Sequence, residues 1–174
     1  LTPNQSASLA RNYAAHPAQV TITLAPSSAQ WRIYPSASAP GGAWQASGAT
    51  VGGLAPGSYA IEYSAFAGYT APAAETVTLA AGQAASYNRS YAPQPAEVTV
   101  TLSISPAQWR IAPVGAPSGQ WNNSGAAVTG LTAGTYTIEY SGWLGYDSPP
   151  TEDVTLAPGQ ALVLSRTYAP RPAH

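Results

Sequence analysis

The chain contains no cysteine, no methionine and no lysine. Without cysteine there is no disulfide framework and no thiolate for a zinc, iron–sulfur or nucleophilic site, so disulfides give no indication of the redox compartment. Because methionine is missing, we expect that the sequence does not begin at a translation start and that it is processed or excerpted from something longer.

Charge is also scarce. Only 7% of the residues are Asp, Glu, Lys or Arg, where roughly 25% is usual for soluble domains. The formal net charge is -1, so the chain has no source of electrostatic attraction toward nucleic acid or an anionic membrane. Weak charge repulsion between molecules suits a chain that is fixed in a matrix, a wall or an assembly. We therefore expect no nucleic-acid partner.

Long hydrophobic runs are absent as well. No apolar run approaches the roughly 18 residues that a membrane helix needs, so the sequence predicts no membrane insertion. The start of the sequence lacks a charged segment followed by an apolar one, so we expect any signal peptide to lie outside it.

The chain does contain an internal repeat, which decides the expected fold. Ala18–Leu24 matches Ala96–Leu102, and farther along Gly57–Ser64 matches Gly134–Ser141. The displacement between the copies is one residue shorter in the later match than in the earlier one. One residue is therefore lost between the two matches, and the similarity runs the whole length of each copy.

A closing segment occurs three times. Leu79–Tyr91 matches Leu156–Tyr168 and also Leu1–Tyr13. We predict that residues 1–17 are the closing strand of a preceding repeat and its linker. Residues 18–95 are then a first β-sandwich repeat, and residues 96–174 are a second repeat with a Pro-rich tail. The surplus strand is a candidate assembly strand, marked by Leu1, Leu9, Arg11 and Tyr13.

Alternation of apolar and polar residues predicts strands throughout. Val20, Ile22 and Leu24 alternate with threonines, the period-two pattern of a half-buried strand. Gly and Pro clusters separate such segments, and no segment keeps a helical period. The fold class is thus all-β, with two tandem immunoglobulin-like or transthyretin-like β-sandwich modules plus an extra N-terminal strand. The expected core anchors are Trp31, Tyr59, Ile61, Tyr63 and their matches Trp109, Tyr136, Ile138 and Tyr140.

These residues resemble a known family. The run Gln30–Ile33, then Trp44–Val51 with Leu54, then Gly57–Tyr63 is similar to the tandem PEGA-like or bacterial immunoglobulin-like repeats of exported bacterial proteins. The resemblance implies a secreted or cell-surface, bacterial β-sandwich that serves as spacer, stalk or adhesive module. It implies no catalytic residues and no cofactor.

Recurring arginines have a structural interpretation. Arg32 recurs as Arg110 at outward parity, and Glu62 recurs with it as Glu139, which predicts a cross-strand ion pair in each copy. The other interpretation is a row of anion-binding arginines. Arg11, Arg89 and Arg166 share parity with apolar positions, so we expect their stems at the edge of the core and their charged heads in solvent.

Aromatic residues near Gly and Pro form the candidate ligand or inter-module contacts. They are Trp44, Phe66, Tyr69, Trp121, Trp143 and Tyr146. Rings presented on loops stack on sugar faces in carbohydrate-binding modules, and they also cap the open end of a sandwich or pack one module on the next. The sequence leaves both interpretations open.

Catalytic and metal-binding patterns are not found. His16 and His174 lie in Pro-rich segments and do not recur, and the few carboxylates do not form a placed pair or a ligand set. We expect a protein that is not an enzyme and that carries no cofactor and no metal.

The leading functional hypothesis is structural. Tandem copies, stiff Pro-bearing linkers and low charge indicate a stalk, a spacer or the subunit of a fibre assembled head to tail, whose partners are itself or neighbouring repeats. Strands such as Val20–Leu24 lack the lysines that often block edge pairing, so we expect that they could pair with a neighbour. Donation of the surplus strand is the less simple scheme, because each copy has its own closing strand. The alternative is an adhesive module that binds polysaccharide.

Overall fold

The computed structural model describes residues 14–116 and 118–172. Leu1, Leu9, Arg11 and Tyr13 of the predicted assembly strand lie outside the described residues, as does His174. Every regular element of the described part is a β-strand. No helix long and apolar enough to cross a membrane occurs in that part of the chain.

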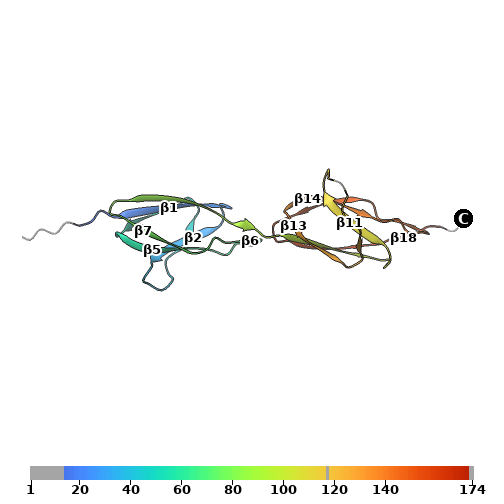
Figure 1. Cartoon of the computed structure of the whole chain (residues 1–174), viewed down its shortest axis with the longest axis horizontal. Coiled ribbons are helices and arrows are strands. Elements are labelled where there is room, and N and C mark those ends of the chain that lie inside the picture. The colour runs from blue at the N-terminus through green and yellow to red at the C-terminus, as the bar shows by residue number, and fades with distance from the viewer. Residues whose placement is uncertain (1–13, 117, 173–174) are drawn as a thin grey trace, which may run out of the picture. The chain divides into compact units, whose positions relative to one another are not determined.

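The chain divides into two compact units (Figure 1). The first holds the residues up to Ser64 together with Pro72–Ser90, and the second holds Ala65–Ala71 and the residues from Tyr91 onward. The short segment Ala65–Ala71 thus groups with the second unit although it lies in the first sequence copy. The division predicted between residues 95 and 96 remains a prediction.

The first unit contains two sheets. Its three-stranded sheet has the order β4 (Thr50–Leu54), β1 (Ala18–Ala25), β8 (Ala84–Ser90). Its four-stranded antiparallel sheet has the order β3 (Gln45–Ala46), β2 (Gln30–Pro35), β5 (Gly57–Tyr63), β7 (Glu75–Leu79). In Figure 1, β1 lies on one side of this unit, and β2, β5 and β7 lie on the other.

The second unit repeats both sheets. They are β13 (Ala127–Leu131), β10 (Ala96–Leu102), β17 (Ala161–Arg166), and β12 (Asn122–Asn123), β11 (Gln108–Pro113), β14 (Gly134–Tyr140), β16 (Glu152–Leu156). Two short ribbons complete it, β6 (Tyr69–Thr70) with β9 (Ala92–Pro93) and β15 (Tyr146–Asp147) with β18 (Ala169–Pro170). The predicted all-β fold of two sandwich modules is confirmed.

The first and last long strands of each module are parallel neighbours. β1 pairs with β8 from Gln19 opposite Ala84 to Ala25 opposite Ser90, and β10 pairs with β17 in the same way. An immunoglobulin constant domain instead groups its first strand with the second, fifth and fourth. β1 and β2 lie in different sheets, as do β10 and β11, so the strand order of the modules differs from that of an immunoglobulin constant domain.

Alternation along each strand builds the core between the two sheets. Val20, Ile22 and Leu24 are buried on the inner face of β1, with Trp31 and Ile61 buried opposite them. The indole N–H of Trp31 donates to the Ala46 carbonyl at 3.1 Å, which satisfies the one polar group of this buried ring. Among the predicted anchors Tyr63 differs, because its side chain is only partly buried.

The second core uses the matching side chains. It contains Val98, Val100, Leu102, Trp109, Ile111, Tyr136, Ile138, Tyr140, Leu156 and Tyr168. The Trp109 indole N–H donates to the Asn123 carbonyl at 3.1 Å. Both cores therefore bury one tryptophan with the same type of hydrogen bond.

One expectation about strand edges was wrong. β1, which contains Val20–Leu24, pairs with β4 on one side and with β8 on the other. It is the central strand of its sheet and has no free edge with which to pair with another chain. Alternation of residues indicates which face of a strand is buried, but the position of the strand within the sheet depends on tertiary packing.

Candidate functional site

Polar side chains that recur between the copies gather in two clusters per copy. The face cluster lies on the outer face of the four-stranded sheet and contains Arg32, Tyr34, Trp44 and Glu62, or Arg110, Ser118, Trp121 and Glu139. The bridging cluster contains Tyr63, Glu75 and Arg89, or Tyr140, Glu152 and Arg166. Together they include most of the charged side chains in the described part of the chain.

The first face cluster is built on two neighbouring strands. Arg32 of β2 stands directly opposite Glu62 of β5, and its Nε and Nη2 donate to Glu62 Oε2 at 2.8 and 2.6 Å. The Tyr34 hydroxyl donates to the other carboxylate oxygen at 2.6 Å. The predicted cross-strand ion pair is therefore formed, and it is used internally rather than held free for an anion.

Trp44 covers this ion pair. The guanidinium carbon of Arg32 lies 4.7 Å from the centre of the Trp44 ring, a cation–π contact. In the second copy the matching carbon of Arg110 lies 4.5 Å from the centre of Trp121. One face of each of these two rings, which the sequence marks as candidate ligand or inter-module contacts, is thus occupied by an arginine of the same cluster.

Hydrogen bonds to Glu62 shift two ionisation equilibria. Donation from Tyr34, followed by donation from Arg32, lowers the pKa of Glu62 from its ordinary value. The same hydrogen bond to Glu62 raises the pKa of Tyr34. The carboxylate is therefore held in its charged form and the phenol in its neutral form, which is the state that keeps the cluster together.

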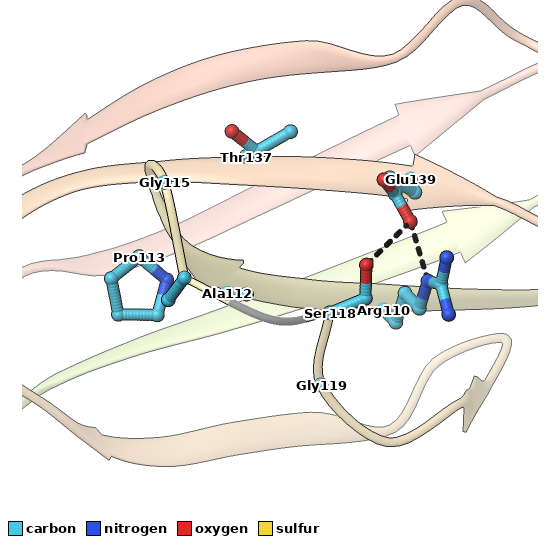
Figure 2. A pocket seen from close by; sticks show the side chains of 9 residues that line it. Arg110, Ala112, Pro113, Gly115, Ser118, Gly119, Thr137 and Glu139 are labelled. Carbon is cyan, nitrogen blue, oxygen red and sulfur yellow. Dashed lines mark hydrogen bonds and ion pairs between the residues drawn. The ribbon is translucent and has the colours of Figure 1, made fainter.

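The second face cluster differs at two positions, 112 and 118, and borders a shallow pocket (Figure 2). Ala112 stands where the first copy has Tyr34, and the pocket next to it has a volume of about 140 Å³. Glu139 pairs with Arg110, and the Ser118 hydroxyl donates to the same carboxylate oxygen at 3.3 Å. The charged groups that line this pocket neutralise each other.

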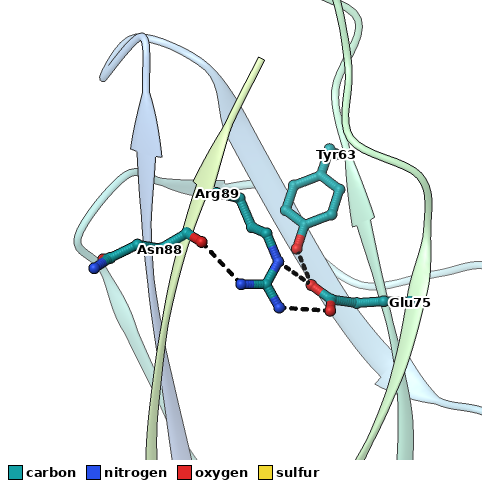
Figure 3. Close-up of polar contacts among 4 residues, drawn as sticks. All are labelled: Tyr63, Glu75, Asn88 and Arg89. Carbon is teal, nitrogen blue, oxygen red and sulfur yellow. Dashed lines mark hydrogen bonds and ion pairs between the residues drawn. The ribbon is translucent and has the colours of Figure 1, made fainter. Parts of the chain in front are cut away.

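The bridging cluster connects the two sheets of each module, and Figure 3 shows the cluster of the first module. Tyr63 and Glu75 come from β5 and β7 of the four-stranded sheet, whereas Arg89 comes from β8 of the other sheet. Arg89 Nε and Nη2 donate to the two Glu75 oxygens at 2.8 and 2.6 Å, and the Tyr63 hydroxyl donates to Glu75 Oε1. A third donation, from Arg89 Nη1 to the Asn88 carbonyl at 2.8 Å, fixes the guanidinium plane.

The second copy reproduces this geometry closely. Arg166 Nε and Nη2 donate to the Glu152 oxygens at 2.7 and 2.6 Å, and Nη1 donates to the Ser165 carbonyl at 2.9 Å. The Tyr140 hydroxyl donates to Glu152 Oε1. The two sheets of each module are therefore connected by an ionic link as well as by the apolar core.

Electrostatics favours the paired state of the bridging cluster. Donation from Arg89, supported by Tyr63, lowers the pKa of Glu75 although burial opposes this shift. Burial, supported by the hydrogen bond to Glu75, raises the pKa of Tyr63. Glu152 and Tyr140 are shifted in the same directions. The sequence predicted Arg89 and Arg166 at the edge of the core, but it did not predict their glutamate partners.

The other predicted aromatics lie in the short ribbons or in the turns that precede them. Phe66 packs against Tyr69, with ring centres 5.6 Å apart, and against Tyr91 at 6.2 Å. Its match Trp143 is 40% exposed. Trp121 and Trp143 thus stand in different settings of the second unit, one on an arginine of the sheet face and one at a ribbon.

Histidine and carboxylate positions form no centre of their own. His16 uses its backbone carbonyl, which accepts the Gly82 N–H at 2.9 Å. In the described residues no group of three or more His, Asp or Glu side chains is placed to hold a metal ion.

Comparison with known proteins shows a likeness to solved structures. No protein-family model matches the chain, and no curated protein matches it. The TIE protein of Bacillus anthracis superposes with a TM-score of 0.51 at 15% identity, over 90% of this chain and 34% of that one. The chain thus spans about a third of the length of that protein.

Two pilins align over more of their own length but less well. The minor pilin GBS52 of Streptococcus agalactiae has a TM-score of 0.37 at 9% identity, over 92% of this chain and 98% of that one. The shaft pilin SpaA of Lactobacillus rhamnosus GG has a TM-score of 0.34 at 13% identity, over 92% and 100%. At such identities the likeness to the TIE protein concerns the fold alone, and the specific resemblance to PEGA-like repeats stays a prediction.

Proposed function

We propose that this chain is a non-catalytic structural repeat segment of an exported bacterial surface protein, in which it serves as a stalk or spacer that carries tension. The observation that supports this most directly is the parallel pairing of the first and last long strands in each module. Assembly head to tail into a fibre, with itself or with neighbouring repeats as partner, is the extended form of the same function.

Parallel pairing determines how a module responds to pulling. When the two ends of a module are drawn apart, β1 and β8 slide along each other, so their hydrogen bonds are loaded in shear and must break together. The paired register covers seven residue pairs in the first module and six in the second. A strand pair loaded from one end would instead lose its hydrogen bonds one after another.

The polar clusters support the same function. The bridging cluster holds the loaded strand β8 to the opposite sheet through Arg89 and Glu75. All five arginines of the described residues are ion-paired within the chain. Side chains that a binding protein would present to a ligand are thus committed to the module itself.

Force spectroscopy tests the proposal on the intact chain. The chain has no cysteine, so pairs of introduced cysteines can serve as unique handles in the first unit. Handles at Ala15 and Ser90 load β1 and β8 in shear, whereas handles at Ser28 and Ser90 peel the same strands apart from one end. We expect a severalfold higher unfolding force for the first pair, and equal forces would contradict a load-bearing role.

Two further measurements separate the forms of the proposal. Filaments in electron micrographs of the concentrated chain would support the fibre, and single particles would support the stalk. Exposed Trp143 keeps one other candidate function, polysaccharide binding, open to test. A glycan array with Trp44→Ala and Trp143→Ala variants decides it, because binding lost in these variants supports an adhesive module and no binding rejects it.

A further inference from the structure

Each sequence copy has a tight turn at the start of its ribbon. We call residues 66–68 the first tip and residues 143–145 the second tip. The turns are alike, because the Tyr69 N–H donates to Phe66 and the Tyr146 N–H donates to Trp143, both at 3.1 Å. Gly68 and Gly145 end the tips with φ of 78° and 81°.

The first tip is covered within the second unit. A Cβ added to Gly68 would lie 2.2 Å from the backbone oxygen of Pro158, and a Cβ added to Gly159 would lie 2.9 Å from the Gly68 Cα. The first tip therefore packs directly on the turn formed by residues 157–160. Contact this close requires glycine on both sides.

Gln94 joins the first tip to this turn through its backbone. Its N–H donates to the Gly68 carbonyl at 2.8 Å, and its carbonyl accepts the Gly159 N–H at 2.9 Å. A single residue of the linker thus satisfies one polar group on each side of the contact. We call it the tip-binding residue.

The second tip has the same turn geometry as the first tip, and it has one of the two hydrogen bonds that Gln94 makes at the first tip. The Arg171 N–H donates to the Gly145 carbonyl at 2.9 Å, as Gln94 does to Gly68. A Cβ added to Gly145 meets nothing within 4 Å. Trp143 is 40% exposed and Leu144 is 96% exposed. Among the described residues this tip therefore has its tip-binding residue, Arg171, but no turn is packed on it.

The first unit contains a turn that matches the turn packed on the first tip. The turn of residues 80–83 matches the turn of residues 157–160, since Gln83 caps the Ala80 N–H at 2.8 Å as Gln160 caps Ala157. Its Gly82 N–H donates to the carbonyl of His16 at 2.9 Å. His16, Gln94 and Arg171 thus occupy the same place, and each is followed by Pro and Ala in the sequence.

We infer that the second tip is a docking surface for the Xaa-Gly turn of a further repeat of this type, joined to the chain after Pro172–Ala173. Arg171 is the tip-binding residue, and its carbonyl accepts the glycine N–H of that turn. The inference rests on the proposed function only in that it concerns an array of repeats. The second tip is then the surface on which a further repeat docks.

The test compares the natural chain with a three-repeat chain, made by joining residues 97–174 once more after Ala173. The added repeat carries the same 157–160 turn that packs on the first tip. We expect that amide exchange in residues 141–146 slows to the rate of residues 64–69 when the repeat is added. Exchange that stays as fast as in the natural chain would overturn the inference.

A matched pair of variants excludes a general stabilising effect of length. Gly68→Ala and Gly145→Ala carry the same backbone strain, since both glycines have positive φ. In the natural chain Gly145→Ala should lower the unfolding temperature less than Gly68→Ala, because only Gly68 faces Pro158. In the three-repeat chain the two losses should become equal, and an unchanged Gly145→Ala loss rejects the docking surface.

These outcomes are independent of the pulling experiment. A shear-resistant module with an unprotected second tip would leave the load-bearing function in place and reject the docking surface. A docked second tip in a module that unfolds at equal force in both geometries would do the reverse.

Discussion

The two copies agree where a module is held together and differ where its surface meets solvent. The bridging cluster has the same residues and nearly the same bond lengths in both copies. The face cluster, by contrast, has Tyr34 in one copy and Ala112 with Ser118 in the other. The comparison teaches that the link between the sheets is constant, whereas the outer face of the four-stranded sheet keeps its Arg–Glu pair and tryptophan but changes the hydroxyl group that donates to the glutamate.

The largest effect is expected from the constant part. Glu75→Gln and Glu152→Gln remove the charge that the arginine pairs with across the sheets. The glutamates are 27% exposed, so the cost lies between that of a surface pair and that of a buried one, about 1–2 kcal/mol for each variant. Urea unfolding followed by circular dichroism measures it.

Glu97→Gln is the control, because the Glu97 side chain takes part in none of the hydrogen bonds or ion pairs found among the described residues. It changes the charge equally and should leave the midpoint almost unchanged. A large difference between the unfolding free energies lost in Glu75→Gln and in Glu152→Gln would show that the two copies are not equivalent.

A smaller effect is expected from pH. Glu75 and Glu152 have pKa values below the ordinary 4.5 because of their arginines and tyrosines. A carboxylate whose folded pKa is lowered stabilises the fold above its unfolded pKa, and this contribution is lost as the pH falls through the folded value. The unfolding free energy should therefore decrease below about pH 4.5.

Urea unfolding between pH 6 and pH 2 measures this decrease. The double variant Glu75→Gln with Glu152→Gln should show a distinctly shallower decrease, with the remaining part owed to Glu62 and the other carboxylates. If the double variant keeps the full pH dependence of the natural chain, the bridging clusters do not control acid stability.

The smallest effect is expected at the variable face. Tyr34→Phe removes the hydrogen bond that contributes most to the lowered pKa of Glu62, so this pKa should rise toward its ordinary value. The unfolding free energy should change less than in Glu75→Gln or Glu152→Gln. Carboxyl NMR shifts of Glu62 measured against pH detect this change. Ser118→Ala is the counterpart in the second copy. An unchanged Glu62 titration in Tyr34→Phe would show that Arg32 alone controls this carboxylate.

Sequence patterns predicted those features that depend on one strand or one strand pair. Alternation located the buried faces of β1 and β5, and the joint recurrence of Arg32 and Glu62 at outward parity predicted their pairing, which the register of β2 and β5 confirms. The all-β class followed from the same periodicity. Local rules are sufficient for these features because neighbouring positions on one sheet are related by simple geometry.

Features that join distant elements were missed. Glu75 and Arg89 lie on different sheets, so their meeting depends on how the sheets face each other. β1 was expected to offer an edge, because its sequence does not reveal two neighbours. The loop aromatics were treated as one set, although Trp44 stacks on Arg32 and Phe66 packs on Tyr69. A stronger signal was available, since Glu75 recurs as Glu152 at the same spacing from its arginine.

Parallel first and last strands have a consequence for how such a gene can change. A module whose chain enters at one end and leaves at the other can be duplicated or deleted as one whole block of sequence. Each remaining block still begins and finishes at the proper end, and none of its own strand pairs is broken. A change in the number of blocks therefore leaves the parallel strand pair within each remaining module intact.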